Sequence, residues 1–140
     1  MKQDDQIKIS IFITSRVSDN ANHGLTELIR SLETNSYNLD QIEVLVKFDD
    51  DDDGVKPLLE MLESTKIRTK YKFGPRGRGY EDIHVGYTSL LEFASPKSKI
   101  YICMADDFEV VNYWDLALLE AFIAASDLAA FSPVPKVNVE

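Results

Sequence analysis

The polar and apolar positions of the chain first predict where its strands lie. Three short runs are almost continuously apolar, which is typical of strands buried on both faces of a sheet. A fourth run alternates between apolar and polar side chains, so we expect one of its faces to be wetter. The apolar runs are residues 7–14, 42–48 and 99–105, and the alternating run is 67–73.

Between these runs, apolar side chains recur every three or four residues, as on one face of an amphipathic helix. The expected helical segments are residues 25–32, 58–62, 83–94 and 112–125. Strands and helices therefore alternate along the whole chain. This order predicts an α/β fold with a mostly parallel sheet, in a single domain over residues 1–140.

Composition and net charge make some classes of binding partner unexpected for this chain. Of the 140 residues, 44% are hydrophobic and 28% are charged, which is typical of a soluble globular protein. The net charge of -9 repels phosphates, so nucleic acids and anionic membranes are not expected partners. No apolar run approaches the ~18 residues of a transmembrane helix. The N-terminus lacks an apolar signal region, and the single Cys103 excludes an internal disulfide, so we expect a cytoplasmic protein.

Polar side chains gather where the predicted strands end. The first strand leads into Thr14, Ser15 and Arg16, the second into the aspartates 49–53, and the fourth into residues 106–107. In parallel α/β sheets, ligands bind beyond the carboxyl ends of the strands. We therefore expect a binding site at this edge of the sheet.

The five consecutive aspartates allow more than one interpretation. Residues 49–54, with Glu60 at the twelfth position, match the ligand pattern of an EF-hand calcium loop. The segment before them reads as a strand, however, and Pro57 occupies a loop position, so the required flanking helix is missing. The run is then either a solvated acidic turn or a turn in which one or two aspartates face a ligand.

Asp106 and Asp107 follow an apolar strand directly. Two carboxylates at the bottom of a crevice need a cation, a shared proton or strong hydrogen-bond donors. Oxygen ligands suit Mg²⁺ or Mn²⁺, and either ion would keep coordination positions for phosphate oxygens. Alternatively, Asp107 caps a following turn or helix.

Further candidates lie after the third and fourth strands. Arg76 and Arg78 sit among glycines in a loop that either contacts phosphate or is a surface turn. His84, on the next predicted helix, is either structural or a ligand contact. Tyr113 and Trp114 begin the last helix, where core packing is the favoured role and stacking on a sugar ring the alternative.

Together these segments resemble the nucleotide-sugar-binding half of family 2 glycosyltransferases with the GT-A fold. The matching motifs are "ISIFITSR", "IEVLVKFDDDDDG", "PRGRGYEDIHVGYTSLLEFA" and "KIYICMADDFEV", which occur in the family's order. The resemblance extends from Ile7 to Phe122 and implies a Rossmann-like nucleotide-binding half.

The resemblance also implies roles for individual residues on the first two strands. Thr14 and Arg16 would border the nucleotide. Asp49, or its neighbour Asp51, would accept the imide N–H of a base such as uracil. The other aspartates of the run would then be solvated.

The remaining implied roles concern the phosphates and the metal. Arg78 would approach the diphosphate, and His84 is kept as a candidate ligand contact. Asp106 would lie near the ribose and the metal, and Asp107 would coordinate the metal directly. Ala105 stands where many members of the family carry the first acid, so the signature here has a shifted form.

The expected function is therefore transfer of a hexose from a nucleotide-diphosphate sugar to a glycan or other hydroxyl acceptor, with Mn²⁺ or Mg²⁺. The family's acceptor half and catalytic base follow the acidic signature, and neither Glu120 nor Asp127 matches the base. The chain is accordingly expected to be truncated before the acceptor half, with an exposed sheet edge that favours a homo-oligomer. The alternative is a nucleotide- or cation-binding module without turnover. A phosphoacceptor receiver domain ranks last, because its acidic pair would follow the first strand.

Overall fold

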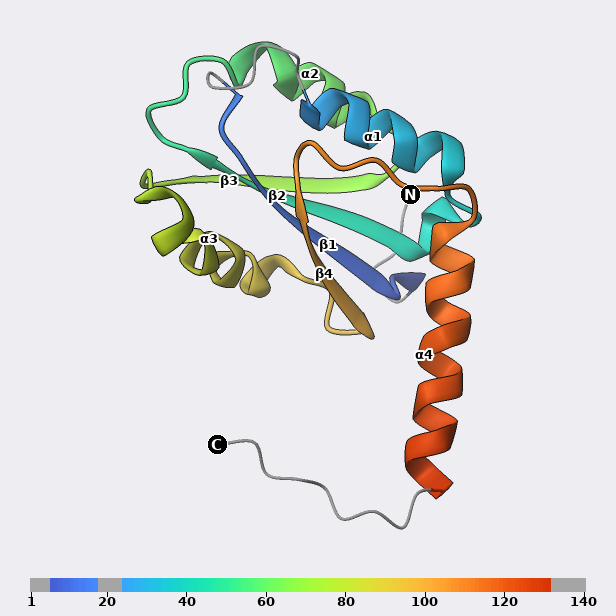
Figure 1. Cartoon of the computed structure of the whole chain (residues 1–140). Coiled ribbons are helices and arrows are strands. Elements are labelled where there is room, and N and C mark those ends of the chain that lie inside the picture. The colour runs from blue at the N-terminus through green and yellow to red at the C-terminus, as the bar shows by residue number, and fades with distance from the viewer. Residues whose placement is uncertain (1–5, 18–23, 132–140) are drawn as a thin grey trace.

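Four parallel strands form the centre of the protein in a computed structural model that describes residues 6–17 and 24–131. The strand order is β3-β2-β1-β4, and every neighbouring pair is parallel (Figure 1). The strands are β1 (Ile9–Ser15), β2 (Ile42–Asp49), β3 (Arg68–Gly74) and β4 (Ile100–Ala105). This arrangement confirms the predicted α/β class with a parallel sheet.

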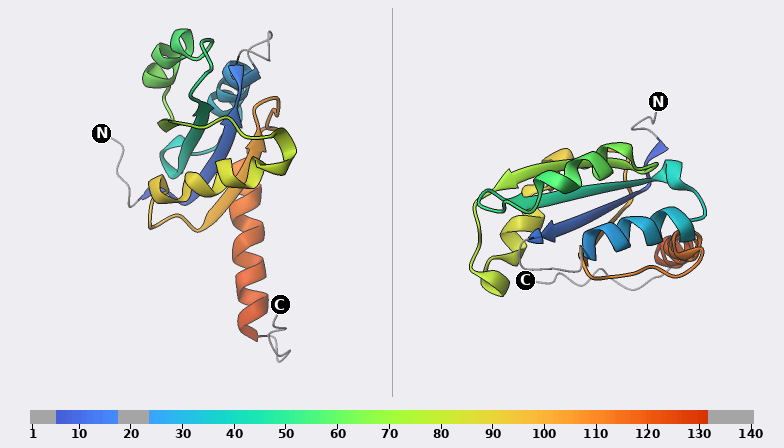
Figure 2. Two further views of the ribbon diagram at one scale, coloured as in Figure 1. Left: turned by 90° about the vertical axis from the view of Figure 1, so that its left-hand side faces the viewer. Right: turned by 90° about the horizontal axis from the view of Figure 1, so that it is seen from above.

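The helices divide between the two faces of the sheet. Two of them, α1 (Gly24–Asn35) and α2 (Lys56–Ser64), cover one face, and α3 (Ile83–Ser89) covers the other (Figures 1 and 2). The last helix, α4 (Trp114–Phe131), begins beside α1 and projects away from the sheet. Three short 3₁₀ helices complete the described elements: η3 (Leu39–Gln41), η4 (Gly79–Glu81) and η5 (Leu91–Phe93).

The core explains why β1 and β2 are mostly apolar. Because side chains alternate along a strand, Ile9, Ile11 and Ile13 join the main core with α1 and α2, whereas Phe12 packs with Leu45 and Leu90 on the α3 side. Both faces of these central strands are therefore covered.

Helix α3 is shorter than its predicted segment, and α4 ends at Phe131 rather than at residue 125. Helical spacing predicted one segment to residue 94, but α3 ends at Ser89 and is followed by η5. The Ser89 hydroxyl donates a 2.6 Å hydrogen bond to the carbonyl of Gly86. The Leu90 amide bonds to the carbonyls of Tyr87 and Thr88, which tightens the last turn. Each observed strand begins and ends within two residues of its predicted run.

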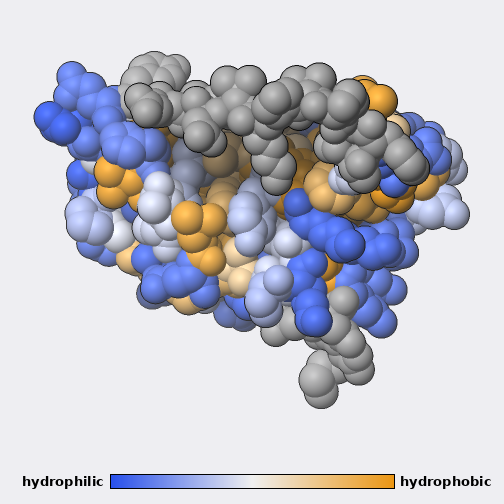
Figure 3. Space-filling view, turned by 90° about the horizontal axis from the view of Figure 1, so that it is seen from below, coloured by the Kyte–Doolittle hydropathy of each residue, from blue (hydrophilic) through white to orange (hydrophobic). Residues whose placement is uncertain are grey.

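The expectation that the fourth strand is buried is wrong for the described chain. β4 is an edge strand that pairs with β1 alone among the described strands, and its side chains Tyr101 and Cys103 are exposed. Apolar side chains are also exposed on α4, at Phe122, Ile123 and Leu128. Viewed from the end toward which α4 projects, apolar and polar side chains are interspersed (Figure 3). Among the described helices, none combines the length and the apolar character needed to cross a bilayer.

Candidate functional site

The connections between the strands create a crevice at their carboxyl ends. From β1 the chain moves outward through β2 to β3, and it then returns to the other side of β1 to form β4. The order therefore reverses between β1 and β4, which is the position where open parallel sheets bind ligands. The segment that makes this return includes α3, so the crevice has α3 as one wall.

A cavity of about 1000 Å³ occupies this position. It is hereafter called the cleft, and a volume of that order holds a drug-sized molecule or larger. The cleft is lined by the carboxyl ends of β1, β2 and β3, the loop after β3, α3 and the residue that follows β4. The lining residues are Thr14, Ser15, Arg16, Lys47, Asp49, Lys72, Phe73, Gly74, Pro75, Arg76, Gly77, Arg78, Gly79, Asp82, Ile83, Val85, Gly86, Ser89 and Asp106.

The floor of the cleft is a row of side chains from adjacent strands. Thr14 on β1 is in register with Lys47 on β2, and Lys47 is in register with Lys72 on β3. Asp49 follows two residues after Lys47, so its side chain lies on the same face of the sheet. Strand periodicity thus brings two ammonium groups and one carboxylate to the side that α3 covers.

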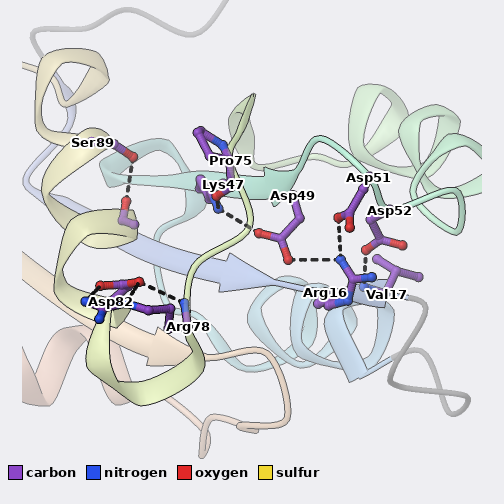
Figure 4. Close-up of polar contacts among 11 residues, drawn as sticks. Arg16, Val17, Lys47, Asp49, Asp51, Asp52, Pro75, Arg78, Asp82 and Ser89 are labelled. Atoms are coloured by element: carbon purple, nitrogen blue, oxygen red, sulfur yellow. Dashed lines mark hydrogen bonds and ion pairs between the residues drawn. The ribbon is translucent and has the colours of Figure 1, made fainter.

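Lys47 is a buried cation with two acceptors. Its Nζ lies 2.7 Å from Oδ1 of Asp49 and 2.8 Å from the carbonyl oxygen of Pro75, which begins the loop after β3 (Figure 4). Only 11% of the Lys47 side chain is exposed. Because a buried charge is costly unless it is paired, these two contacts explain how a buried lysine is accommodated in β2.

Arg16 connects the end of β1 to the aspartate run. Its Nη1 lies 3.2 Å from Oδ2 of Asp49 and 2.7 Å from Oδ1 of Asp51 (Figure 4). The side chain of Asp49 is 13% exposed, whereas that of Asp51 is 57% exposed. The hydrogen bond from Arg16 lowers the pKa of Asp51 below its ordinary value. Asp49 is therefore the aspartate that reaches the cleft, and Asp51 is a surface partner of Arg16.

The other aspartates of the run have different environments. Asp52 is buried and accepts hydrogen bonds from the amides of Val17 and Gly54, which ties the turn to the end of β1. Asp50 and Asp53 are exposed. The run follows a strand and forms a turn, so the helix that an EF-hand requires before its loop is absent there.

Arg78 is bound by carboxylates in the loop after β3. Its Nε and Nη2 each lie 2.9 Å from an oxygen of Asp82, and its amide donates a 2.8 Å hydrogen bond to the same carboxylate. A further ion pair of 3.2 Å joins Arg78 to Glu81. The hydrogen bonds from Arg78 lower the pKa of Asp82 to about 2. The paired arginine and aspartate thereby fix the end of the loop against the start of α3.

Of the two aspartates after β4, one lines the cleft and the other is exposed to solvent. Asp106 is half-buried, lines the cleft and accepts a 2.8 Å hydrogen bond from the hydroxyl of Ser15. Burial raises the pKa of Asp106, the hydrogen bond from Ser15 opposes this, and the adjacent charge of Asp107 raises it further. Asp107 is exposed and does not line the cleft.

The segment after the acidic pair is held against the C-terminal end of α1. The Val110 amide donates to Ser31, the Asn35 side chain donates to the Val110 carbonyl, and the buried Asp115 accepts from the amides of residues 37 and 38. Trp114 is partly buried against the core and donates to Ser36, as core packing predicted.

Tyr113 has a different environment from Trp114. It is 54% exposed and contacts Tyr37 edge to face, so the favoured core-packing role is wrong for Tyr113.

The lining of the cleft is more cationic than the protein as a whole. It contains five cationic side chains and three carboxylates, although the net charge of the chain is -9. The cationic side chains are Arg16, Lys47, Lys72, Arg76 and Arg78. A locally positive cleft in an acidic protein concentrates anions, so its charge is suited to a phosphate-bearing ligand.

The structure brings most of the predicted site residues together. The members of the predicted set that line the cleft are Thr14, Arg16, Asp49, Arg78 and Asp106. Asp51, His84 and Asp107 are exposed and are not among the lining residues. His84 lies on α3, whose neighbouring residues Ile83 and Val85 do line the cleft.

Sequence reasoning missed three charged residues of the cleft, namely Lys47, Lys72 and Asp82. A signal for Lys47 was present, because a lysine within the apolar run "IEVLVKF" must have buried partners or leave the sheet. No comparable signal marks Asp82, whose importance depends on its position four residues after Arg78.

A divalent metal ion at the acidic pair after β4 would need coordinating oxygen atoms from a bound diphosphate as well as from the protein. Among the described residues, no three His, Cys, Asp or Glu side chains are arranged to hold an ion. Asp106 lines the cleft, and Asp107, the next residue, is exposed outside the lining. Mg²⁺ commonly binds through one or two carboxylates together with water and substrate phosphates. An ion here would need Asp106, Asp107 and the oxygens of a bound diphosphate together.

Solved structures with a similar fold provide an independent comparison. No protein family profile and no curated sequence matches this chain. The structure of S. aureus TarS 1-349, a GT-A-type glycosyltransferase, superimposes with a TM-score of 0.64 at 20% sequence identity, covering 85% of this chain and 33% of TarS 1-349. TarS 1-349 in complex with UDP gives a TM-score of 0.63, again at 20% identity, with 85% and 32% covered.

A third structure, of S. aureus TarS, gives a TM-score of 0.62 at 20% identity, covering 86% of this chain and 20% of that one. This chain thus spans at most about a third of the length of these structures. The matches agree with the four-stranded parallel sheet, and the chain has a GT-A-like fold.

Proposed function

We propose that the cleft binds the nucleotide-diphosphate part of a sugar donor, and that the chain is the donor-binding part of a glycosyltransferase. The observation that carries the proposal is the cleft itself. It includes the point where the strand order reverses, and it is lined by the largely buried Asp49 carboxylate and by a cationic loop. The UDP complex of TarS, whose fold is similar, supports a uridine nucleotide as the first ligand to test.

Asp49 is proposed to recognise the base. Its carboxylate is held by Lys47 and Arg16, at 2.7 and 3.2 Å, and it is 13% exposed. Because this carboxylate is already fixed, it would accept the imide N–H of uracil with little further loss of side-chain conformational entropy. Each of its oxygens has a second lone pair, so the two existing contacts leave acceptor capacity for a ligand.

The loop of residues 75–79 is proposed to face the diphosphate. Arg76 and Arg78 both line the cleft, and arginine forms bidentate contacts with phosphate oxygens. Arg78 already contacts Asp82 and Glu81. A phosphate reaching Arg78 would share its guanidinium with these carboxylates, and Arg76 would provide the second cation.

Asp106 and Asp107 are proposed to hold Mn²⁺ or Mg²⁺ together with oxygens of the bound diphosphate. Such an ion, when bound, would act as a Lewis acid that stabilises the charge on the departing nucleoside diphosphate. Ser15 fixes the orientation of Asp106 through its 2.8 Å hydrogen bond. The raised pKa of Asp106 indicates a carboxylate for which a nearby cation would be favourable.

A nucleotide-binding module without turnover is the second candidate. Each carboxylate that lines the cleft already accepts a hydrogen bond from a protein donor: Asp49 from Lys47 and Arg16, Asp82 from Arg78, and Asp106 from Ser15. Each of the three therefore has a role within the fold that does not depend on an acceptor hydroxyl. This observation favours binding over complete catalysis by residues 6–17 and 24–131.

Calorimetric titration of UDP and GDP, each with and without Mn²⁺, tests the proposal. We expect UDP to bind more tightly with Mn²⁺ than with a chelator, and the Asp107→Ala variant to lose that difference. Binding that is unaffected by the chelator would contradict the metal role, and no binding of either nucleotide would contradict the donor site. A sugar-transfer assay with UDP-hexoses then separates an enzyme from a binding module.

A further inference from the structure

We propose that Lys47 is a positioning residue, which couples the Asp49 carboxylate to the loop of residues 75–79. The effect of this coupling on ligand binding rests on the proposed function, in which Asp49 contacts the base and the loop contacts the diphosphate. The coupling itself rests on the contacts of Lys47 and is testable without any nucleotide.

The two acceptors of Lys47 belong to different parts of the cleft. Asp49 ends β2, whereas Pro75 begins the loop that follows β3. The ammonium lies within 2.8 Å of both acceptors, so it adds a side-chain link to the backbone hydrogen bond of 2.8 Å from the Asp50 amide to the Gly74 carbonyl. A purely structural lysine would need acceptors only to offset the cost of burying its charge, and these acceptors could lie anywhere. Both acceptors of Lys47 instead belong to residues that line the cleft.

The aliphatic part of Lys47 runs past two glycines. A Cβ added to Gly74 would lie 3.1 Å from Lys47 Cε, and one added to Gly86 would lie 3.9 Å from Lys47 Cδ. Gly74 is the last residue of β3, and Gly86 lies on α3. The absence of side chains at these positions leaves space for a long, extended stem, so the ammonium reaches the loop rather than the sheet surface.

The loop is anchored at its other end by Asp82. This carboxylate accepts hydrogen bonds from the Arg78 amide and from two nitrogens of its guanidinium. Lys47 therefore fixes the first residue of the loop and Asp82 fixes the fourth, while the residues of the loop remain exposed (Figure 4). Loss of the Lys47 contact would release one of these two anchor points.

Lys72 provides a matched control. It is the neighbouring lysine in the same row of the sheet, and it also lines the cleft. Its Nζ contacts the Ser89 carbonyl and Glu92, both at 3.4 Å, and neither acceptor belongs to the loop. Lys72→Met thus removes a cation from the cleft without releasing Pro75.

Limited trypsin digestion, followed by mass spectrometry, measures the coupling directly. Arg76 and Arg78 are exposed cleavage sites within the loop, and the exposed Arg30 on α1 serves as an internal reference for general unfolding. We expect Lys47→Met to raise the ratio of loop cleavage to Arg30 cleavage about tenfold, as for loss of one charge-assisted hydrogen bond. Lys72→Met should leave this ratio within about twofold of wild type.

Should Lys47→Met fail to fold, Lys47→Gln is the second variant, because its shorter side chain does not span both acceptors. An unchanged ratio in the folded variant overturns the inference, whether or not the wild-type protein binds UDP. An equal rise at Arg30 also overturns it, because that result indicates a general loss of stability.

Nucleotide affinity supplies a second test if the wild-type protein binds UDP. We expect Lys47→Met and Asp49→Asn to weaken UDP binding non-additively, since both disrupt the same contact. Fully additive effects would contradict a role exerted through Asp49. Failure of wild-type binding would count against the proposed function alone, because the cleavage ratio still decides the coupling.

Discussion

The hydroxyl of Ser15 donates a 2.8 Å hydrogen bond to the carboxylate of Asp106, although the two residues are 91 positions apart in the chain. Ser15 ends β1 and Asp106 follows β4, so the bond crosses the point at which the strand order reverses. It holds the carboxylate of Asp106 at the cleft. Any account of this site must therefore explain why a half-buried carboxylate is kept there.

We expect Asp106→Asn to stabilise the ligand-free protein at neutral pH. Burial raises the pKa of Asp106 above its ordinary value of 3.8, so the folded state holds the proton more tightly than the unfolded state. The free energy of unfolding should therefore fall as the pH rises through the range just above 3.8. The asparagine keeps an acceptor for Ser15 without this penalty, and the advantage should disappear in acid, where Asp106 is protonated.

Denaturant unfolding at pH 7 and near pH 3 measures this difference. Asp107→Asn is the control, because Asp107 is exposed and its replacement should change the free energy of unfolding by less than about 0.5 kcal/mol. An Asp106→Asn protein that is less stable than wild type at pH 7 would show that the carboxylate is needed for folding.

Asp49→Asn should weaken UDP binding much more than Asp51→Asn. Asp49 faces the cleft and is held by two cations, whereas Asp51 is exposed and pairs with Arg16 at the surface. We expect a loss of about 1.5–3 kcal/mol for Asp49→Asn, or roughly tenfold to hundredfold in Kd. Asp51→Asn should change Kd by less than about threefold. Equal losses in the two variants, measured by calorimetry, would remove the distinction between them.

Gly86→Ala should disrupt the packing of α3 on β1. A Cβ at this position would lie 2.6 Å from Cγ2 of Thr14, which is too close for any real contact. We expect the substitution to cost about 1–3 kcal/mol in the free energy of unfolding. Thr14→Ser removes the opposing methyl group, so Gly86→Ala should cost much less in the Thr14→Ser background. Denaturant unfolding of the two single variants and the double variant would reveal this coupling, and simple additivity would contradict it.

The Arg78 and Asp82 pair should titrate at unusually low pH. Hydrogen bonds from Arg78 lower the pKa of Asp82 to about 2, so the pair is intact above 3.8 and is lost as the pH falls through about 2. Carboxyl carbon shifts in NMR spectra should give a midpoint near 2 for Asp82, and Arg78→Ala should move it back toward 3.8. A wild-type midpoint within the ordinary range of aspartates would show that the pair does not persist in solution.

The strands and the parallel sheet could be predicted because they follow from short patterns of neighbouring residues. Continuous apolar runs indicate strands covered on both faces, and β1 and β2 have such cover. The edge position of β4 could not be predicted, because residues 99–105 are as apolar as those of a central strand. Strand order depends on the face that each connecting helix covers, and helical spacing alone does not specify that face.

The carboxylates of the site were recognisable, but their partners were not. Asp49 and Asp106 were predicted from their positions after apolar strands, and both line the cleft. The contacts of Lys47 with Asp49 and Pro75 depend on the register between β2 and β3, which the sequence does not state. The metal, the donor sugar and the cytoplasmic location remain predictions, as does self-association through the sheet edge.

Amide chemical-shift mapping during a titration with UDP and Mg²⁺ determines whether the cleft is a nucleotide site. We expect perturbations that cluster at the carboxyl ends of β1 and β2, along residues 74–79, on α3 and around Asp106. Residues on α4, far from the cleft, should be unaffected and serve as the internal reference. Perturbations confined to α4, or none at millimolar UDP, would contradict a nucleotide site in the cleft.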